Sequence, residues 1–185
     1  MAEYSYDLKI PRDRIAVLIG KDGEIKKALE DETKIKIAVD SQEGDIQISG
    51  NDAISLFAVR EVIRAVGRGF NPQIAQLLLR QDYVFEMLNV QDYAKNPNQL
   101  TRIKGRLIGS QGKARRNIED LTETYIWVYG KTVSVIGTAE MVAIARKAVE
   151  SLLLGSTHKS VYAWLEKKCR EMRMFGTDGL RKPLE

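Results

Sequence analysis

The sequence is short of the residues on which much enzyme and metal chemistry depends. Its 185 residues include one histidine, His158, and one cysteine, Cys169. A lone cysteine forms no disulfide within the chain, and one residue of each type cannot build a Cys/His zinc cluster. A Ser-His or Cys-His nucleophile would have to use His158, which is flanked by Ser and Thr and far from any other candidate. We therefore expect no metal site, no cofactor and no enzyme activity.

Long apolar runs are also missing. No uninterrupted apolar stretch approaches the ~20 residues that span a bilayer, and residues 1–7 lack the basic start and apolar run of a signal peptide. Hydrophobic residues make up 44% of the chain and charged residues 29%, enough to bury a core and stay soluble. These features predict a cytoplasmic protein that makes no contact with a membrane. The formal charge of +4 is too small to identify a partner.

The sequence does contain a repeat of itself. The segment Ile19–Gly23 recurs as Ile108–Gly112, an offset of 109 − 20 = 89 residues, and each segment contains a Gly-x-x-Gly turn. One such turn is weak evidence, because it is common by chance. The same offset also relates other pairs, which together indicate a duplicated domain: Glu30 with Glu119, Asp31 with Asp120, Thr33 with Thr122, Ile37 with Ile126, and Val39 with Val128.

Hydrophobic periodicity predicts the same order of elements in both copies: strand, helix, glycine turn, helix, strand, strand, helix. In the first copy these elements are residues 4–10, 13–19, 24–32 and 35–39, a strand at Ile46 and Ile48, and a helix capped by Asn51 or Asp52. The apolar stripe of that helix is expected to be Ile54, Phe57, Ala58, Val62 and Ala65. In the second copy they are residues 85–90, 100–108, 113–123, 125–129 and 132–136, and a helix capped by Thr138 with Met141, Ile144, Ala145, Ala148 and Leu152 buried.

The remaining segments are expected to be ordered except at the C-terminal end. Asn71 and Pro72 are typical of a helix start, and the apolar residues that follow predict a structured linker. After Gly155, Ser156 could cap a final helix with Val161, Trp164, Leu165, Cys169 and Met172 on one face. The predicted division is a first domain over 1–69, a linker helix over 70–84, a second domain over 85–155, a final helix over 156–175 and a flexible tail over 176–185.

The order of elements resembles that of the type I K-homology (KH) domain, which binds RNA. The resemblance implies an α+β fold with two tandem β-α-α-β-β-α units, each a three-stranded sheet with helices on one face. The glycines suit this function because they let a ligand backbone approach closely. They also direct the N–H groups and the positive dipole end of the next helix toward a phosphate. The resemblance further implies a groove for about four nucleotides, floored by Leu107, Ile108, Ala114, Ile118 and Ile126.

Charge distinguishes the two glycine turns. Between residues 102 and 116 there are six basic side chains and no acidic one, whereas residues 12–27 hold five basic and three acidic side chains. A helix pair whose glycines only permit tight packing is the alternative for either copy, but a solvated face normally mixes both signs of charge. We therefore expect the main RNA contacts in the second copy, at Arg102, Lys104, Arg106, Ile108, Gly109, Ser110, Gln111, Gly112, Lys113, Arg115, Arg116 and Ile126.

The first copy is predicted to be the weaker RNA site. Its candidate residues are Ile19, Gly20, Lys21, Asp22, Gly23, Lys26, Lys27 and Ile37. Asp22 lies inside the glycine turn, where a phosphate would have to approach, although Lys21 beside it offers some compensation.

Three aromatic residues of the second copy, Tyr125, Trp127 and Tyr129, lie on the strand face opposite Ile126 and Val128. Aromatic side chains stack nucleobases, so this face could be a second RNA surface. The amphipathic helices at 74–78 and 161–172 need an apolar partner, however. We therefore favour coverage of this face by the linker helix, the first domain or the final helix.

The second half is similar to the partner-of-Nob ribosome-assembly family. The likeness rests on residues 105–113, 117–122, 135–137, 153–156 and Val161–Tyr162. It implies a non-catalytic factor that binds single-stranded RNA at the 3′ end of 16S ribosomal RNA and modulates cleavage there by a Nob-type PIN-domain endonuclease. Gly20 and Gly23 persist here and a long N-terminal extension is missing, which by this resemblance indicates an archaeal member. For such members it also implies contact with the alpha subunit of archaeal initiation factor two.

Other functions remain open at this stage. The KH folds could serve as a protein-interaction scaffold, or the chain could be a general RNA-binding protein in mRNA translation or decay. A metal-dependent nuclease is disfavoured. The paired carboxylates Glu30–Asp31 and Glu119–Asp120 are helix neighbours that point about 100° apart, so helix capping and surface pairing explain them better.

Overall fold

The computed structural model describes residues 4–178, with side chains described as far as residue 174. The first unit contains β1 (Tyr4–Lys9), α1 (Arg12–Ile19), η1 (Lys21–Gly23), α2 (Glu24–Thr33), β2 (Lys36–Val39), β3 (Asp45–Gly50) and α3 (Ala53–Gly67). The second contains β4 (Tyr83–Asn89), η3 (Val90–Tyr93), α5 (Pro97–Ile108), η4 (Ser110–Gly112), α6 (Lys113–Thr122), β5 (Tyr125–Tyr129), β6 (Thr132–Thr138) and α7 (Ala139–Leu153). The β-α-α-β-β-α order predicted for both copies is confirmed.

Each unit has one three-stranded antiparallel sheet, ordered β1-β3-β2 in the first and β4-β6-β5 in the second. The repeat extends to the register. Ile37 of β2 pairs with Ile48 of β3, and its counterpart Ile126 of β5 pairs with Val135 of β6. The strand that follows the second helix of each unit, β2 or β5, is therefore an edge strand. Its outer hydrogen-bonding groups are not paired with another strand of the sheet.

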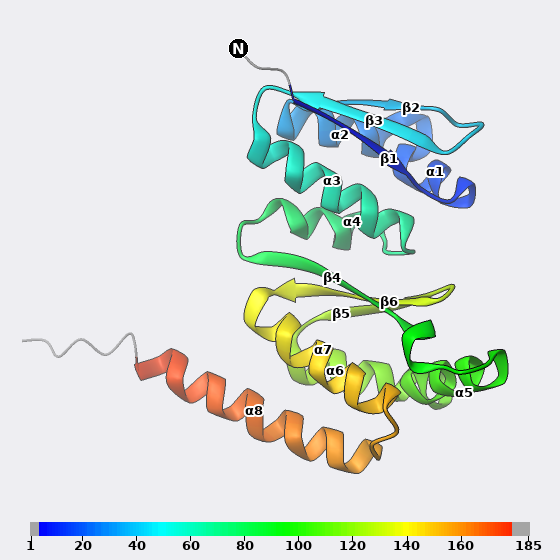
Figure 1. Cartoon of the computed structure of the whole chain (residues 1–185). Coiled ribbons are helices and arrows are strands. Elements are labelled where there is room, and N and C mark those ends of the chain that lie inside the picture. Colours follow the sequence, from blue (N-terminus) through cyan, green and yellow to red (C-terminus); the bar gives the residue numbers. More distant parts are fainter. Residues whose placement is uncertain (1–3, 179–185) are drawn as a thin grey trace, which may run out of the picture.

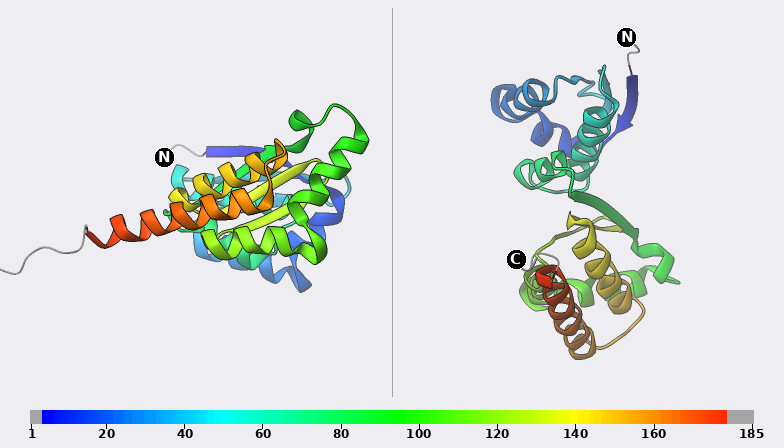
Figure 2. Two further views of the ribbon diagram at one scale, coloured as in Figure 1. Left: turned by 90° about the horizontal axis from the view of Figure 1, so that it is seen from below. Right: turned by 90° about the vertical axis from the view of Figure 1, so that its left-hand side faces the viewer.

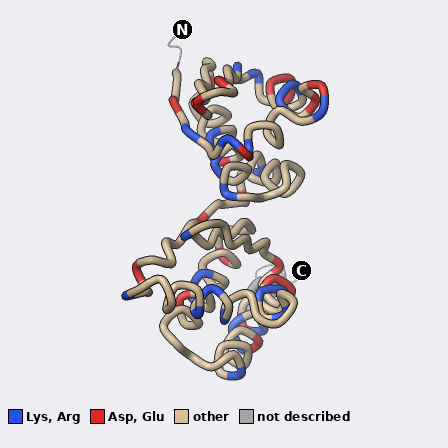
Figure 3. Tube along the Cα trace, turned by 90° about the vertical axis from the view of Figure 1, so that its right-hand side faces the viewer, with Lys and Arg blue, Asp and Glu red and all other residues tan. Residues whose placement is uncertain are grey.

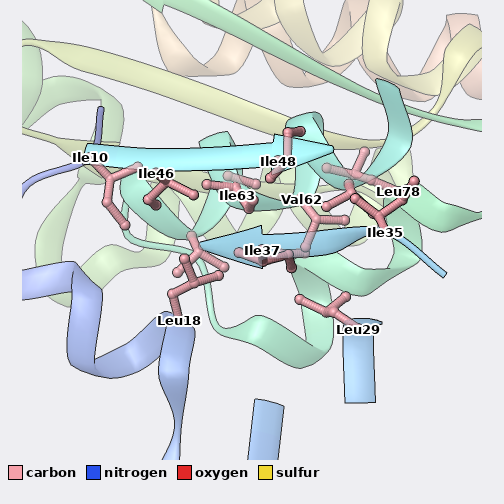
Figure 4. Packing of buried hydrophobic residues seen from close by; sticks show 14 of the residues in the cluster. Ile10, Leu18, Leu29, Ile35, Ile37, Ile46, Ile48, Val62, Ile63 and Leu78 are labelled. Carbon is pink, nitrogen blue, oxygen red and sulfur yellow. The ribbon is translucent and has the colours of Figure 1, made fainter. Parts of the chain in front are cut away.

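The first core is formed between its sheet and its three helices. Figure 4 shows Leu18 and Leu29 extending from the helices toward Ile37, Ile46 and Ile48 of the strands. The expected stripe of α3 is partly wrong, because Ile54 and Phe57 are 73% and 53% exposed. The buried apolar side chains of α3 are instead Leu56, Val59, Val62, Ile63, Ala65 and Val66, a face that includes only Val62 and Ala65 of the prediction. The predicted cap Asp52 is confirmed, since its carboxylate accepts hydrogen bonds from the Ile54 and Ser55 N–H groups.

The second core is covered on its outer side by α8 (His158–Asp178), which packs on α6 and α7. Figure 2 shows this helix along the helical side of the second unit, away from the first. It extends beyond residue 175 into the predicted tail as far as Asp178, and residues 179–185 lie outside the described part. Two predicted caps differ. Thr138 precedes α7 without a side-chain capping bond, and Thr157 rather than Ser156 accepts a hydrogen bond from the Ser160 N–H.

The linker is ordered, as expected, and joins the two units into one body. It consists of α4 (Pro72–Ala75), capped by Asn71, and η2 (Gln76–Leu79). Figure 1 shows α4 between α3 and the strand β4, which leads into the second sheet. Phe70 is buried here, its ring 6.3 Å from that of Phe85, and Ile136 of β6 belongs to the core of the first unit. The core of the first unit therefore extends across the junction onto the second sheet.

Within residues 4–178, no helix is both long enough and apolar enough to cross a membrane.

Candidate nucleic-acid interface

The two glycine turns have the same backbone conformation. The first glycine has φ 76° and ψ 177° at Gly20 and φ 72° and ψ 176° at Gly109. The third position is left-handed in both, with φ 53° at Asp22 and 52° at Gln111. The last glycine has φ 78° at Gly23 and 76° at Gly112. The repeat in the sequence is therefore a repeat of a particular turn, and differences between the copies lie in their side chains.

At Gly109 two constraints exclude any other residue type. Its φ is positive, and a Cβ there would lie 2.6 Å from the Cβ and 2.7 Å from the backbone nitrogen of Ala114. A close approach of α5 to α6 therefore requires glycine. As a result, the start of α6 has no side chain standing between its backbone and the solvent over the turn.

The start of α6 is open and positively charged. The residue before the helix is Gly112, so no side chain caps the first turn of α6; the Lys113 N–H donates to the Ser110 carbonyl. Lys113 occupies the first helical position, and Ser110 and Gln111 of the turn are exposed. A helix start without a side-chain cap, the helix dipole and a lysine together favour an anion such as a phosphate.

The six basic residues between positions 102 and 116 do not all face the turn. Arg102 and Lys113 are exposed, and their side chains make no hydrogen bond or ion pair within the described residues. Arg116 lies at the turn, where it donates to the Gln111 carbonyl. Lys104 donates to the Gly130 carbonyl at 2.6 Å, and Arg106 donates to the Ser156 carbonyl at 2.5 Å.

Arg106 is thus held at the start of α8. Its Nε is buried without a hydrogen bond, and its own carbonyl lies 2.8 Å from His158 Nε2. Among the basic residues expected to contact RNA, this side chain has a structural attachment that the sequence did not indicate. The only histidine is therefore part of a helix junction, and the only cysteine, Cys169, is buried on α8.

The apolar residues expected to form the floor of the groove in the second unit lie together, but most of them are buried from solvent. Leu107, Ala114, Ile118 and Ile126 are each at most 5% exposed, whereas Ile108, beside the glycine turn, is 36% exposed. Ile108 therefore offers the apolar contact area, and the other four residues support it from below.

Both edge strands are capped by a glutamate that sequence analysis assigned only to generic capping and surface pairing. Glu119 of α6 accepts the Ile126 N–H at 2.7 Å, and Glu30 of α2 accepts the Ile37 N–H at 2.8 Å. Burial raises the pKa of the Glu119 carboxyl, against the lowering effects of the Ile126 N–H and the Arg115 guanidinium. The recurrence of glutamate at the 89-residue offset was the signal, but only the fold shows what each carboxylate contacts.

The glycine turn of the first unit has a different charge. Lys21 and Asp22 are both exposed, and Glu24 occupies the first position of α2, where α6 has Lys113. Lys26 pairs with Glu30 at 3.4 Å, while Lys27 is exposed and Ile19 is half-buried. Figure 3 shows both signs of charge in each half of the chain, so the contrast is local to the turns.

The aromatic residues of β5 are covered on one side only. Trp127 lies against Gly69 and 6.5 Å from the Phe70 ring, so the junction does cover part of this face, as expected. The Tyr129 hydroxyl donates to Asp13 of α1 at 3.0 Å. Tyr125 and Trp127 nevertheless remain 39% and 40% exposed. The final helix contributes nothing here, because it packs on the opposite side of the second unit.

Comparison with known proteins agrees with this geometry. Residues 5–65 match the KH domain family, and residues 84–170 match the family described as "Eukaryotic type KH-domain (KH-domain type I)". A KH domain-containing protein of Methanocaldococcus jannaschii is 44% identical over 170 residues, covering 90% of this chain and 74% of the relative.

Two further similarities carry names that refer to RNA. The pre-rRNA-processing protein PNO1 of Chaetomium thermophilum is 29% identical over 143 residues, which cover 72% of this chain but 54% of the relative. The crystal structure of an a/eIF2alpha-aDim2p-rRNA complex from Pyrococcus horikoshii matches with a TM-score of 0.85 and 40% identity, covering 91% of this chain and 96% of that one. The chain belongs to the partner-of-Nob (PNO1/Dim2) family of proteins with two KH domains.

Proposed function

We propose that this protein is an RNA-binding factor of small-subunit ribosome assembly that holds single-stranded RNA at the 3′ end of 16S ribosomal RNA. The observation that carries the proposal is the open start of α6, where uncapped N–H groups, Lys113 and the Gly109–Gly112 turn meet. Relatives named for pre-rRNA processing, and a similar chain in a complex with rRNA, support the choice of RNA.

In this proposal the second unit supplies the main contacts. The sugar-phosphate backbone lies over the glycine turn, with Lys113 and Arg102 free to pair with phosphates, and a base rests on Ile108. Ser110 and Gln111 are exposed in the turn and allow the backbone to approach. The first unit contributes less, because Asp22 and Glu24 lie where a phosphate would approach its own turn.

The test introduces acidic residues into the second turn. A Ser110→Asp, Gln111→Asp variant should bind a single-stranded RNA of the 16S 3′ end at least tenfold more weakly, because two carboxylates would face the phosphates. Lys21→Asp is the matched control. Because Asp22 is already present, this single substitution also places two acidic residues in the first turn. Equal binding by the double variant and the parent protein would show that the second turn is not the site.

Affinity measured against salt gives a second criterion. The logarithm of the binding constant should fall with the logarithm of salt concentration by about 0.7 for each phosphate contacted on a single strand. A scaffold that binds proteins through the same fold would retain its partner without this dependence on RNA and salt.

The finer parts of the proposal concern partners. We place this chain beside a Nob-type PIN-domain endonuclease, whose cleavage at the 16S 3′ end it modulates, and beside the alpha subunit of archaeal initiation factor two. The rRNA complex of the similar Pyrococcus horikoshii chain, which contains a/eIF2alpha, supports the second partner. Cleavage of a 3′-extended 16S RNA by the endonuclease should change in rate when this protein is added, and the Ser110→Asp, Gln111→Asp variant should have no effect.

A further inference from the structure

A pocket at the domain junction lies directly beside the edge strand of the second unit. Its volume is about 550 Å³, within the ordinary range of ligand sites. Tyr125, Ile126 and Trp127 of β5 form one wall, Arg115 and Glu119 of α6 another, and the first unit closes the third with residues from α1 and the linker. Because Arg115 and Ile126 were also predicted to contact RNA in the second unit, the pocket adjoins the path of the proposed RNA.

The polar groups of the pocket are concentrated at the edge strand. Arg115 Nη1 donates to the Ile126 carbonyl at 3.3 Å, and Glu119 accepts the Ile126 N–H on the same residue. The Arg115 Nε is buried and makes no hydrogen bond, although it lies 3.4 Å from Glu119 Oε2. A carboxylate and a guanidinium side by side offer an acceptor and donors, which matches the mixed donor and acceptor edge of a nucleobase.

The aromatic wall suits the flat face of a base. The Arg115 guanidinium lies 5.3 Å from the centre of the Trp127 ring, and Tyr125 and Trp127 each keep about two fifths of their surface exposed. Trp127 packs against Gly69 and lies 6.5 Å from the Phe70 ring, and these contacts restrict its ring before any ligand arrives. A packed, partly exposed indole beside a guanidinium and a carboxylate is a stacking platform of the kind that single-stranded nucleic acids use.

The first unit supplies the other side of this pocket. Arg14 of α1 is fixed by its hydrogen bonds to the Val66 and Phe70 carbonyls, at 2.9 and 2.8 Å, and lines the pocket with Val17 and Ile74. Both KH units are therefore needed to form it, although only one has the open basic turn.

We propose that this junction pocket receives a nucleobase of the bound RNA that lies outside the KH groove, stacked on Trp127 and Tyr125 and hydrogen-bonded by Arg115 and Glu119. The proposal rests on the RNA binding proposed above and adds one further nucleobase-binding position to that site. The bound strand leaves the groove of the second unit and places its next base between the two units.

The experiment is an abasic scan. An RNA of about ten nucleotides from the 16S 3′ end exceeds the roughly four that a KH groove holds, so single abasic replacements report each base in turn. Beyond the positions in the groove, one further replacement should weaken binding to the parent protein about 5- to 150-fold, the range for loss of one stacked base. Trp127→Ala should bind the intact RNA more weakly by a similar factor and should no longer respond to that replacement.

Two variants make the result independent of folding. Trp127→Phe keeps an aromatic platform and should restore the response, while Trp164→Ala removes the other tryptophan, on α8, and should leave the whole scan unchanged. If the scan of Trp127→Ala retains the same extra sensitive position as that of the parent protein, the pocket proposal is wrong. A parent protein that binds no RNA would instead refute the proposed function itself.

Discussion

The two KH units share one turn geometry and differ in the side chains around it. The backbones at Gly20–Gly23 and Gly109–Gly112 match closely, and in both units a glutamate caps the edge strand. Yet the first helical position after the turn is Glu24 in one unit and Lys113 in the other, and the residue packed under the first glycine is Ile25 in one and Ala114 in the other. The two copies share the backbone of the glycine turn, while the charge at the turn and the space beside it differ.

The difference under the first glycine predicts the largest effect. In Gly109→Ala the new Cβ would meet the backbone of Ala114, which cannot move away, whereas in Gly20→Ala it would meet the side chain of Ile25, which can. Added to the cost of a positive φ, this predicts a loss of about 2–5 kcal/mol in the free energy of unfolding for Gly109→Ala. Gly20→Ala should lose less.

Urea denaturation of both variants measures this difference. Equal destabilisation would show that the two turns are packed alike. The proposed difference in packing under Gly20 and Gly109 would then be wrong.

The charge at the helix start can be exchanged between the units. Lys113→Glu should weaken RNA binding about tenfold and lower the salt dependence by about 0.7, the value for one phosphate contact on a single strand. Glu24→Lys should strengthen binding by a smaller factor, because Asp22 remains in the turn of the first unit. Titrations at several salt concentrations measure both quantities, and a Lys113→Glu variant with an unchanged slope would contradict the assignment of that lysine to a phosphate.

The smallest expected effect is a pH dependence at Glu119. Burial raises the pKa of its carboxyl in the folded state, so its contribution to stability is present below the ordinary pKa of about 4.5 and is lost as the pH rises through the raised value. Glu119→Gln keeps an oxygen for the Ile126 N–H and removes the titration. Relative to this variant, the parent protein should therefore lose unfolding free energy as the pH is raised from about 4 to 7. Parallel curves for the two proteins would contradict this prediction.

The sequence predicted the elements better than the faces they bury. Helices and strands were found because apolar residues recur at regular spacing and because the two copies support each other. The buried face of α3 was misplaced, since this helix is apolar almost all round. Ile54 and Phe57 fit the period as well as Leu56 and Val59 do, and only the positions of the sheet and the linker decide between them.

In the candidate site, too, some features could be predicted from the sequence and others could not. The Gly109–Gly112 turn and Lys113 could be identified from local sequence alone, because the turn requires glycines and the charge run is short-range. The attachment of Arg106 to the Ser156 carbonyl and the placement of Trp127 against Gly69 could not. Both depend on contacts between residues about 50 positions apart or more, for which one sequence gives no signal.

The first core extends through Phe70, Phe85 and Ile136 onto the second sheet, and this bears on how the chain would bind RNA. Two modules on a flexible tether can each find their own stretch of RNA, and their joint affinity depends on tether length. Here the spacing and orientation of the two turns are set by packed side chains. In the RNA binding proposed above, a strand would therefore meet two turns at one set spacing rather than two independently moving modules.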